Sequence, residues 1–223
     1  MSIGFRILTD VPRAPDALID RFLDVPTAHI SDCMQRLFAA GAPLRPLHRG
    51  GKLLGNALTV KVRPGDNLMV HKAIDMAQRR DVIVVDAGGD LTQAIIGELM
   101  MRHAQKRGIA GLVINGAVRD LATIGADTYP VYGAGVTHRG PYKDGPGEIN
   151  VPVAIGGMVV HPGDIVVGDE DGVVAVPLLE AEGILELTAA QRRREDKTMV
   201  EILAGTVDRS WVDAALKARG LKL

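Results

Sequence analysis

The stretch VIVVDAGGDLTQAIIGELMMRHAQKRGIAGLVINGAVRD, from Val82 to Asp120, decides the fold class. A β-branched run, Val82–Val85, meets a glycine turn, and an amphipathic segment follows. A second apolar run, Gly111–Ile114, comes next. This order predicts a strand, a turn, a helix, a strand and a second turn, which is typical of an α/β protein.

Three polar residues of this stretch are the first candidates for chemistry. Arg119 and Asp120 follow the second predicted strand, beyond a turn at Gly116, and Glu98 lies within a helix predicted over Thr92–Lys106. Polar groups just past the carboxyl ends of neighbouring strands converge on the crevice where α/β proteins bind ligands. A plainer interpretation stays open, because a mid-helix Glu is ordinarily solvated and an adjacent Arg and Asp can form an exposed pair.

The surroundings of Glu98 favour a cleft over solvent. Gly97 allows a backbone or a ligand to come close, and Leu99 and Met100 are apolar. A dinucleotide site is not indicated, since the glycines at 88, 89 and 97 do not match the G-x-G-x-x-G spacing.

Composition excludes several classes of protein. With 223 residues, of which 47% are hydrophobic, the chain can bury the core of one domain, and we expect residues 1–223 to form a single one. The formal net charge is −1 and the main basic cluster is Arg192–Arg194, which argues against nucleic acid as a direct ligand. A single cysteine, Cys33, excludes an internal disulfide and indicates a reducing compartment. Without a signal-peptide pattern or an apolar run of about 18 residues, we expect a soluble cytoplasmic protein that does not bind membranes.

The rest of the chain divides into three segments with different sequence patterns. Upstream, a helix is expected from Thr27 to about Ala40 and a strand over Leu58–Val62. Short Val-rich runs broken by Gly, Pro or Asp over Pro130–Pro177 predict a β-rich layer. A helical extension over about 178–223 comprises a long helix, Leu178–Ala204, and a short one, Asp208–Arg219, and a long terminal helix of this kind often packs on a neighbouring subunit.

Several motifs together resemble one known family. They are TAHISD (27–32), GELM (97–100), GLVINGAVRD (111–120) and NVPVAIGGMVVHPGDIVVGDEDGVVAVP (150–177). The sequence resembles the class II pyruvate aldolases that cleave 4-hydroxy-4-methyl-2-oxoglutarate and 4-carboxy-4-hydroxy-2-oxoadipate, which share their fold with RraA, the regulator of ribonuclease E activity A. The family pattern is an Asp, twenty residues, then Arg-Asp. Twenty residues also separate Glu98 from Arg119, so the spacing holds with a Glu in the first place.

The resemblance implies an architecture and a set of metal-binding residues. The fold would be a three-layer β/β/α swivelling domain, assembled as trimers or hexamers with sites between subunits. Asp120 would ligate a divalent cation, magnesium or manganese, and Glu98 would touch it through water. Glu195 matches an acid that the adjacent subunit contributes.

The resemblance also implies how a substrate is held. Arg119 would bind the pyruvyl oxygens, and the backbone N–H groups of Leu99 and Met100, after Gly97, would receive the carboxylate. Retro-aldol cleavage and oxaloacetate decarboxylation both leave pyruvate enolate, whose charge a hard cation stabilises as a Lewis acid. Arg119 adds a bidentate partner that stays protonated.

The cluster as read from the sequence contains no lysine and no histidine. The absence of lysine argues against a Schiff-base route. The absence of histidine makes a metal-bound water, held by Glu98 or Asp120, the expected proton carrier. The sequence leaves the substituent at C4 of the substrate open.

The rival hypothesis is a non-catalytic regulator of the RraA type that binds an RNA-degrading enzyme. Retention of both Arg119 and Asp120 favours the lyase, because a binding module has no need of a metal ligand beside an anion holder. A methyltransferase is disfavoured, since no glycine-rich loop for S-adenosylmethionine precedes a downstream acid.

Overall fold

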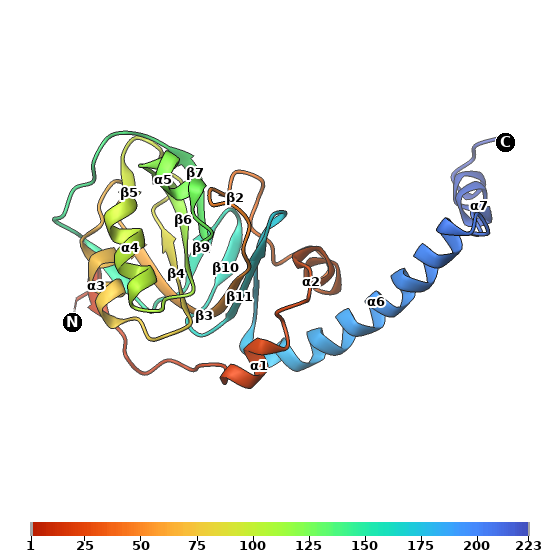
Figure 1. Ribbon diagram of the computed structural model, residues 1–223, viewed down its shortest axis with the longest axis horizontal. Helices are drawn as coiled ribbons and strands as arrows, with labels where there is room; N and C mark the ends of the chain where they lie inside the picture. The colour runs from red at the N-terminus through yellow and green to blue at the C-terminus, as the bar shows by residue number, and fades with distance from the viewer. Residues whose placement is uncertain (1, 223) are drawn as a thin grey trace.

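Parallel strands at the centre of one mixed sheet organise the computed structural model, which describes residues 2–222 (Figure 1). Within that range ten strands belong to this sheet, and its main path runs β1-β8-β3-β4-β6-β7-β2. They are β1 (Phe5–Ile7), β2 (Arg45–Pro46), β3 (Leu53–Val62), β4 (Asp81–Asp86), β5 (Ala94–Ile96), β6 (Gly111–Val118), β7 (Val131–Val136), β8 (Gly147–Ile149), β11 (Ile165–Asp169) and β12 (Gly172–Val176). A separate hairpin pairs β9 (Val153–Ile155) with β10 (Met158–Val160).

Along the chain, some helices lie between strands, and the last two follow the final strand. They are α1 (Asp16–Asp20), α2 (Thr27–Cys33), α3 (Leu68–Met76), α4 (Glu98–Lys106), α5 (Leu121–Ala126), α6 (Ala181–Leu203) and α7 (Ser210–Ala218), with a 3₁₀ turn at Leu178–Glu180. None of these helices is long and apolar enough to cross a membrane.

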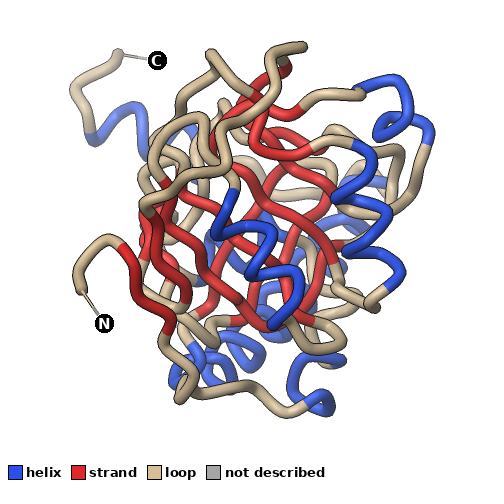
Figure 2. Tube along the Cα trace, turned by 90° about the vertical axis from the view of Figure 1, so that its left-hand side faces the viewer, coloured by secondary structure: helices blue, strands red, loops and turns tan. Residues whose placement is uncertain are grey.

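Strand β4 shows why the fold has three layers. Its side chains alternate between two faces, as in any strand. Ile83 and Val85 join the core formed with α3 and α4, whereas Val82 and Val84 join the core formed with β9 to β12. All four are fully buried, and each contributes about 1.5–3 kcal/mol of hydrophobic stabilisation. Figure 2 looks onto the helical face of the sheet. The structure therefore has the β/β/α layers that the resemblance implies.

The central position of β3 explains a difference from the sequence prediction. The strand begins at Leu53, five residues before the predicted start at Leu58. It pairs with β4 on one side and with β8 and β11 on the other, so the run from 53 to 60 is buried on both faces and lacks the alternation that marks a half-exposed strand.

Two further boundaries differ from prediction in the stretch that decides the fold. The helix predicted over Thr92–Lys106 begins at Glu98, because the buried run Ala94–Ile96 forms β5 and pairs in parallel with β6. Gly116 is not in a turn: β6 continues to Val118, and a Cβ at Gly116 would lie 3.1 Å from the Cβ of Ala87.

Helix α2 ends seven residues before the predicted boundary at Ala40. It stops at Cys33, and Gln35 and Arg36 then adopt positive φ angles of 58° and 63°, which end the helical path. Hydrogen bonds from Thr27 to Asp169 instead connect the start of α2 to the end of β11.

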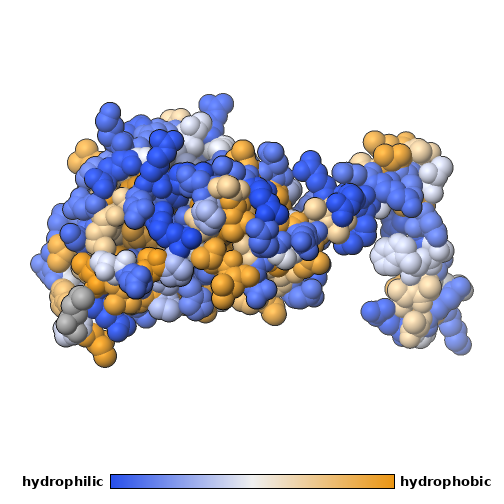
Figure 3. Space-filling model, turned by 90° about the horizontal axis from the view of Figure 1, so that it is seen from below, coloured by the Kyte–Doolittle hydropathy of each residue, from blue (hydrophilic) through white to orange (hydrophobic). Residues whose placement is uncertain are grey.

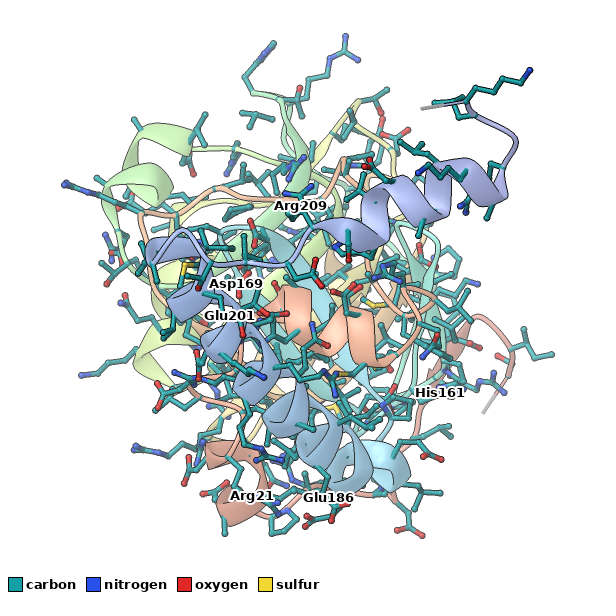
Figure 4. All side chains as sticks on the ribbon, turned by 90° about the vertical axis from the view of Figure 1, so that its right-hand side faces the viewer. Arg21, His161, Asp169, Glu186, Glu201 and Arg209 are labelled. Carbon is teal, nitrogen blue, oxygen red and sulfur yellow. The ribbon has the colours of Figure 1, made fainter. Side chains whose placement is uncertain are left out.

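The C-terminal helices form an arm that leaves the body of the protein (Figures 1 and 3). The part of α6 up to Glu195 is anchored: Ala181 and Leu185 are buried in a cluster with Phe22, Arg21 of α1 pairs with Glu182, and His29 of α2 contacts Glu195. Figure 4 shows Arg21 near the first turns of α6. Further along, Leu203 and Trp211 are exposed. The two helices coincide closely with those predicted.

Candidate functional site

Parallel pairing of β5 with β6 brings the three candidate residues together. Ile96 lies opposite Val118 in the register, so the chain leaves both strands at the same edge of the sheet. Glu98 follows one strand, and Arg119 and Asp120 follow the other. The backbone N–H of Glu98 donates a hydrogen bond to Oδ2 of Asp120 at 2.9 Å, and Arg119 Nε lies 3.8 Å from the same oxygen.

Asp120 adopts a backbone conformation that few residues tolerate. Its φ is 60° and its ψ is 37°, in the left-handed region, at the N-cap of α5. Asp and Asn enter this region more readily than most residues with a side chain. The backbone carbonyl of Asp120 accepts hydrogen bonds from Thr123 and Ile124. The backbone that carries the Asp120 carboxylate is therefore fixed.

Gly97 has an extended backbone, and its value lies in its missing side chain. A Cβ at this position would lie 2.4 Å from Oδ2 of Asp120 and 2.9 Å from Cγ of Arg119. Only glycine lets the end of β5 approach both residues. The close approach that Gly97 is expected to allow therefore occurs, and the group that comes close to it is the Arg119-Asp120 pair.

Glu98 is the first residue of α4 and not a mid-helix residue, which corrects the prediction. A carboxylate in the first turn is favoured by the helix dipole. Its side chain is half-exposed, and Arg102 Nε lies 3.9 Å from it. The N–H groups of Leu99 and Met100 also lie in this first turn, where the helix has no carbonyl four residues earlier to receive them. Such donors are suited to binding a carboxylate.

A cavity of about 220 Å³ opens beside this cluster. Ile95, Ile96, Gly97, Leu99, Met100 and Pro141 line it together with four polar side chains, Arg119, Asn67, His71 and Lys143. The prediction that no histidine or lysine falls in the cluster is therefore wrong. The i,i+4 spacing of Asn67, the N-cap residue of α3, and His71 is a signal that could have placed them on one side of this helix.

The chemistry of the cavity wall follows from burial. Burial lowers the pKa of His71, and the nearby Lys143 lowers it further, so the imidazole is neutral at pH 7. Asn67 is 2% exposed, and its Nδ2 donates to the carbonyl of Ile95 at 2.9 Å. Its Oδ1 has no hydrogen-bond partner among the described residues. The wall thus contains a neutral imidazole and an acceptor without a donor.

Lys143 lies on the segment between β7 and β8, which Asp66 fixes. The buried Asp66 carboxylate accepts hydrogen bonds from the backbone N–H groups of Leu68, Asp144 and Gly145 at 2.8–2.9 Å. Burial alone would raise the pKa of Asp66, but these donors and Arg63 outweigh it and hold the pKa below its ordinary value. Asp66 therefore joins the start of α3 to the segment that carries Lys143.

Replacing Asp66 by Asn is expected to lower the free energy of unfolding by about 2–4 kcal/mol at pH 7, because an amide group cannot accept all these bonds. A lowered folded-state pKa contributes stability above the unfolded pKa of about 4, and that contribution is lost as the pH falls through the folded value. Urea unfolding at pH 7 and pH 3 measures the difference. The gap between wild type and variant should shrink at pH 3, whereas Asp75→Asn, at an exposed position of α3, should change little. A gap that is equal at both pH values would contradict this assignment.

The donor set near Asp120 suits magnesium better than zinc. No group of three or more His, Cys, Asp or Glu side chains that could hold a metal occurs within residues 2–222. Asp120 and Glu98 offer two half-exposed carboxylates, and only Oδ2 of Asp120 is engaged by a backbone N–H. Mg²⁺ is commonly bound by one or two carboxylates and keeps several waters, so these residues fit it.

Glu195 is not near this cluster in its own chain. It lies on α6, which runs along the other side of the molecule from α4 and β5 (Figure 1). There it contacts His29 Nε2 at 2.6 Å and accepts a hydrogen bond from Gln191 at 2.8 Å. A contribution of Glu195 to the site of an adjacent subunit stays a prediction.

Comparisons with known proteins agree on one family. The model of a family described as RraA-like (Aldolase/RraA) matches residues 27–175. A protein of Halalkalibacterium halodurans named "Putative 4-hydroxy-4-methyl-2-oxoglutarate aldolase" is 39% identical over 189 residues, which cover 85% of this chain and 90% of that protein.

Solved structures show the same relationship. A Streptomyces coelicolor protein, described as an unusual member of the RNase ES inhibitor RraA family, has a TM-score of 0.77 at 26% identity. The alignment covers 85% of this chain and 99% of that one. The RNA-processing inhibitor RraA of Thermus thermophilus has a TM-score of 0.64 at 29% identity and covers 70% and 94%.

Proposed function

The chain belongs to the RraA-like family, and on that premise we propose that it is a divalent-metal-dependent lyase that cleaves 4-hydroxy-2-oxo acids to pyruvate. The reaction is a retro-aldol cleavage of 4-hydroxy-4-methyl-2-oxoglutarate or 4-carboxy-4-hydroxy-2-oxoadipate, with oxaloacetate decarboxylation as a second activity. One observation carries the proposal: Arg119, the half-exposed carboxylate of Asp120 and the N-terminus of α4 meet beside a single cavity.

The pyruvyl half of the substrate is bound by Arg119 and the start of α4. The Arg119 guanidinium makes paired hydrogen bonds to the adjacent carboxylate and keto oxygens. The N–H groups of Leu99 and Met100 donate to the carboxylate, helped by the helix dipole. Gly97 keeps these donors close to Arg119 and Asp120.

Asp120 and Glu98 would hold the divalent cation, Asp120 as a ligand and Glu98 through water. When bound, Mg²⁺ or Mn²⁺ acts as a Lewis acid that stabilises charge on the keto oxygen by several kcal/mol. Arg119 places that oxygen next to Asp120, and its own charge stabilises the same enolate.

Proton transfer completes the reaction. The Glu98 carboxylate accepts the proton of the C4 hydroxyl through a bridging water, which passes one proton on as it takes another, and the hydroxyl oxygen becomes a carbonyl as the C3–C4 bond breaks. The electron pair of that bond stays on the pyruvyl fragment as the enolate, which is then protonated at C3. Lys143 is exposed, whereas lysines that form Schiff bases are typically desolvated, so the metal route is retained.

A regulator that binds an RNA-degrading enzyme is the second candidate, because structural relatives are named as inhibitors of RNA processing. Regulation of this kind needs a surface and not an anion-binding cavity with two half-exposed carboxylates beside it. We further propose that the chain assembles as a trimer or hexamer, and that Glu195 reaches the site of a neighbouring subunit.

The test is an assay of pyruvate release from oxaloacetate and from 4-hydroxy-4-methyl-2-oxoglutarate. Wild type with Mg²⁺ should release pyruvate from both, and EDTA should abolish release. Arg119→Ala should lower kcat/KM by about 1,000-fold, since it removes the bidentate partner of the enolate. The absence of pyruvate under every condition would favour the regulator.

A further inference from the structure

A second cavity lies at the other end of α3 from the first one. Its volume is about 260 Å³, and Met76, the last residue of α3, lines it, whereas His71, nearer the start of that helix, lines the first cavity. We propose that this second cavity binds a free α-amino acid with an aliphatic side chain, whose carboxylate contacts Arg13 and whose ammonium group contacts Asp81 and Asn150. The inference does not depend on the proposed lyase activity.

One wall of the second cavity is the segment of residues 9–13, which precedes α1. Both ends of this segment are fixed to the sheet. Leu8 donates its N–H to the carbonyl of Ile149 at 3.1 Å, and Ala14 donates its N–H to Oδ1 of the buried Asn56 at 2.8 Å. The cavity therefore lies between the sheet and a preorganised segment, and largely preformed cavities of this kind are where small molecules bind.

One cation and one anion lie side by side on the wall of this cavity. Nη1 of Arg13 lies 2.6 Å from Oδ1 of Asp81, whose side chain is 2% exposed. Burial raises the pKa of Asp81, although the hydrogen bond from Gln78 N–H and the charge of Arg13 lower it, so a second cationic donor would stabilise this carboxylate. The Arg13 guanidinium has five N–H donors and can bind a further carboxylate beside Asp81. A pair without net charge suits a zwitterion, which brings one charge of each sign.

A buried acceptor on the same wall lacks a donor. Asn150 is 6% exposed, and its Nδ2 donates to the carbonyl of Leu8 at 2.7 Å. Its Oδ1 has no hydrogen-bond partner among residues 2–222. An ammonium group has three N–H donors and can serve both Asn150 and Asp81, whereas a carboxylate has none. The unpartnered oxygen therefore favours a ligand that carries an amino group.

The rest of the wall is largely apolar, which indicates the third part of the ligand. Leu58 and Met76 belong to the core between the sheet and α3, and Val11 lines the cavity from the segment of residues 9–13. An aliphatic side chain would remove these surfaces from water. The volume lies just below the value of about 300 Å³ at which cavities for drug-sized ligands begin, so it suits a single amino acid.

The experiment is isothermal titration calorimetry of the full chain with L-leucine and with two analogues that each lack one charged group. Isoamylamine lacks the carboxylate of leucine, and isocaproate lacks its amino group. Wild type should bind L-leucine with a Kd of about 0.1–1 mM and each analogue at least about tenfold more weakly, because each analogue loses a charge-assisted hydrogen bond.

Arg13→Gln tests the charge pair, because it removes the cation for the carboxylate and leaves Asp81 free for the ammonium group. The preference for L-leucine over isoamylamine should fall to about threefold or less, and isoamylamine should bind more tightly than it binds wild type. Unfolding would weaken both ligands, so a gain for the amine separates the two effects. Arg79→Gln, at an exposed position outside the cavity, should leave all three affinities unchanged.

Two further variants locate the ligand within the chain. Val11→Trp fills the cavity without changing the charge pair, so it should abolish binding of L-leucine while the melting temperature stays within a few degrees of wild type. Arg119→Ala changes the first cavity alone and should bind L-leucine as wild type does.

The outcomes decide the inference independently of the pyruvate assay. No binding of L-leucine to wild type at millimolar concentration, or equal binding of either analogue, would show that the inference is wrong. Binding that is lost in Arg119→Ala and kept in Arg13→Gln would place the amino acid in the first cavity and would also contradict it. Binding that needs both charges of leucine and the Arg13 side chain supports the amino-acid site, whether or not pyruvate is released from any substrate.

Discussion

Replacing Asp120 by Asn is expected to lower kcat/KM for pyruvate release by about 1,000-fold or more, because the substitution removes the carboxylate that we propose as the ligand of the cation. Asn has the same shape and tolerates the left-handed conformation at φ 60°. It can still accept the 2.9 Å hydrogen bond from Glu98 N–H. The loss should therefore come from chemistry and not from unfolding.

The control for Asp120→Asn is a measurement of thermal stability on the same sample, which separates a loss of chemistry from unfolding. The melting temperature of the variant should lie within a few degrees of wild type. Steady-state rates with oxaloacetate at saturating Mg²⁺ give the change in kcat/KM. Activity within about tenfold of wild type would remove Asp120 from its proposed role.

Replacing Gly97 by Ala is expected to lower kcat/KM by about 100-fold, although the change adds a single methyl group. The new Cβ would lie 2.4 Å from Oδ2 of Asp120 and 2.9 Å from Cγ of Arg119, so both side chains must move. A displacement of about 1 Å at reacting groups can cost about 100-fold in rate. Kinetics with oxaloacetate should show the loss mainly in kcat.

Gly125→Ala is the matched control for this substitution. Gly125 lies in α5, and a Cβ there would make only an ordinary contact, 3.6 Å from the carbonyl oxygen of Leu47. We expect wild-type activity for this variant. Full activity of Gly97→Ala would mean that the close packing at the end of β5 is not required for catalysis.

Strand identity was predictable where the pattern was local. The runs in β4 and β6 are apolar and β-branched, and the Val-rich segment from 130 to 177 yields β7 to β12. The three-residue strand β5 was missed because Ala94–Ile96 also fits a helical period, and only its pairing with β6 decides between the two. Tertiary pairing likewise extends β3 to Leu53 and carries β6 past Gly116.

The sequence predicts only those candidate site residues that lie close together along the chain. Glu98, Arg119 and Asp120 follow strands that are neighbours in the sequence, so the rule for carboxyl ends brings them together. His71 and Lys143 reach the same cavity from α3 and from the segment before β8, through contacts made by Asp66. No local pattern encodes a contact between residues 66 and 144, and the predicted absence of histidine and lysine failed for that reason.

Titration of Mg²⁺ into wild type and Asp120→Asn, each with oxalate as a mimic of pyruvate enolate, tests the central claim most directly. The claim is that the Asp120 carboxylate holds a divalent cation beside Arg119. Calorimetry should give one Mg²⁺ site per chain in wild type and binding weakened at least about tenfold in the variant. Equal Mg²⁺ affinity in the two proteins, or no binding to wild type, would contradict it.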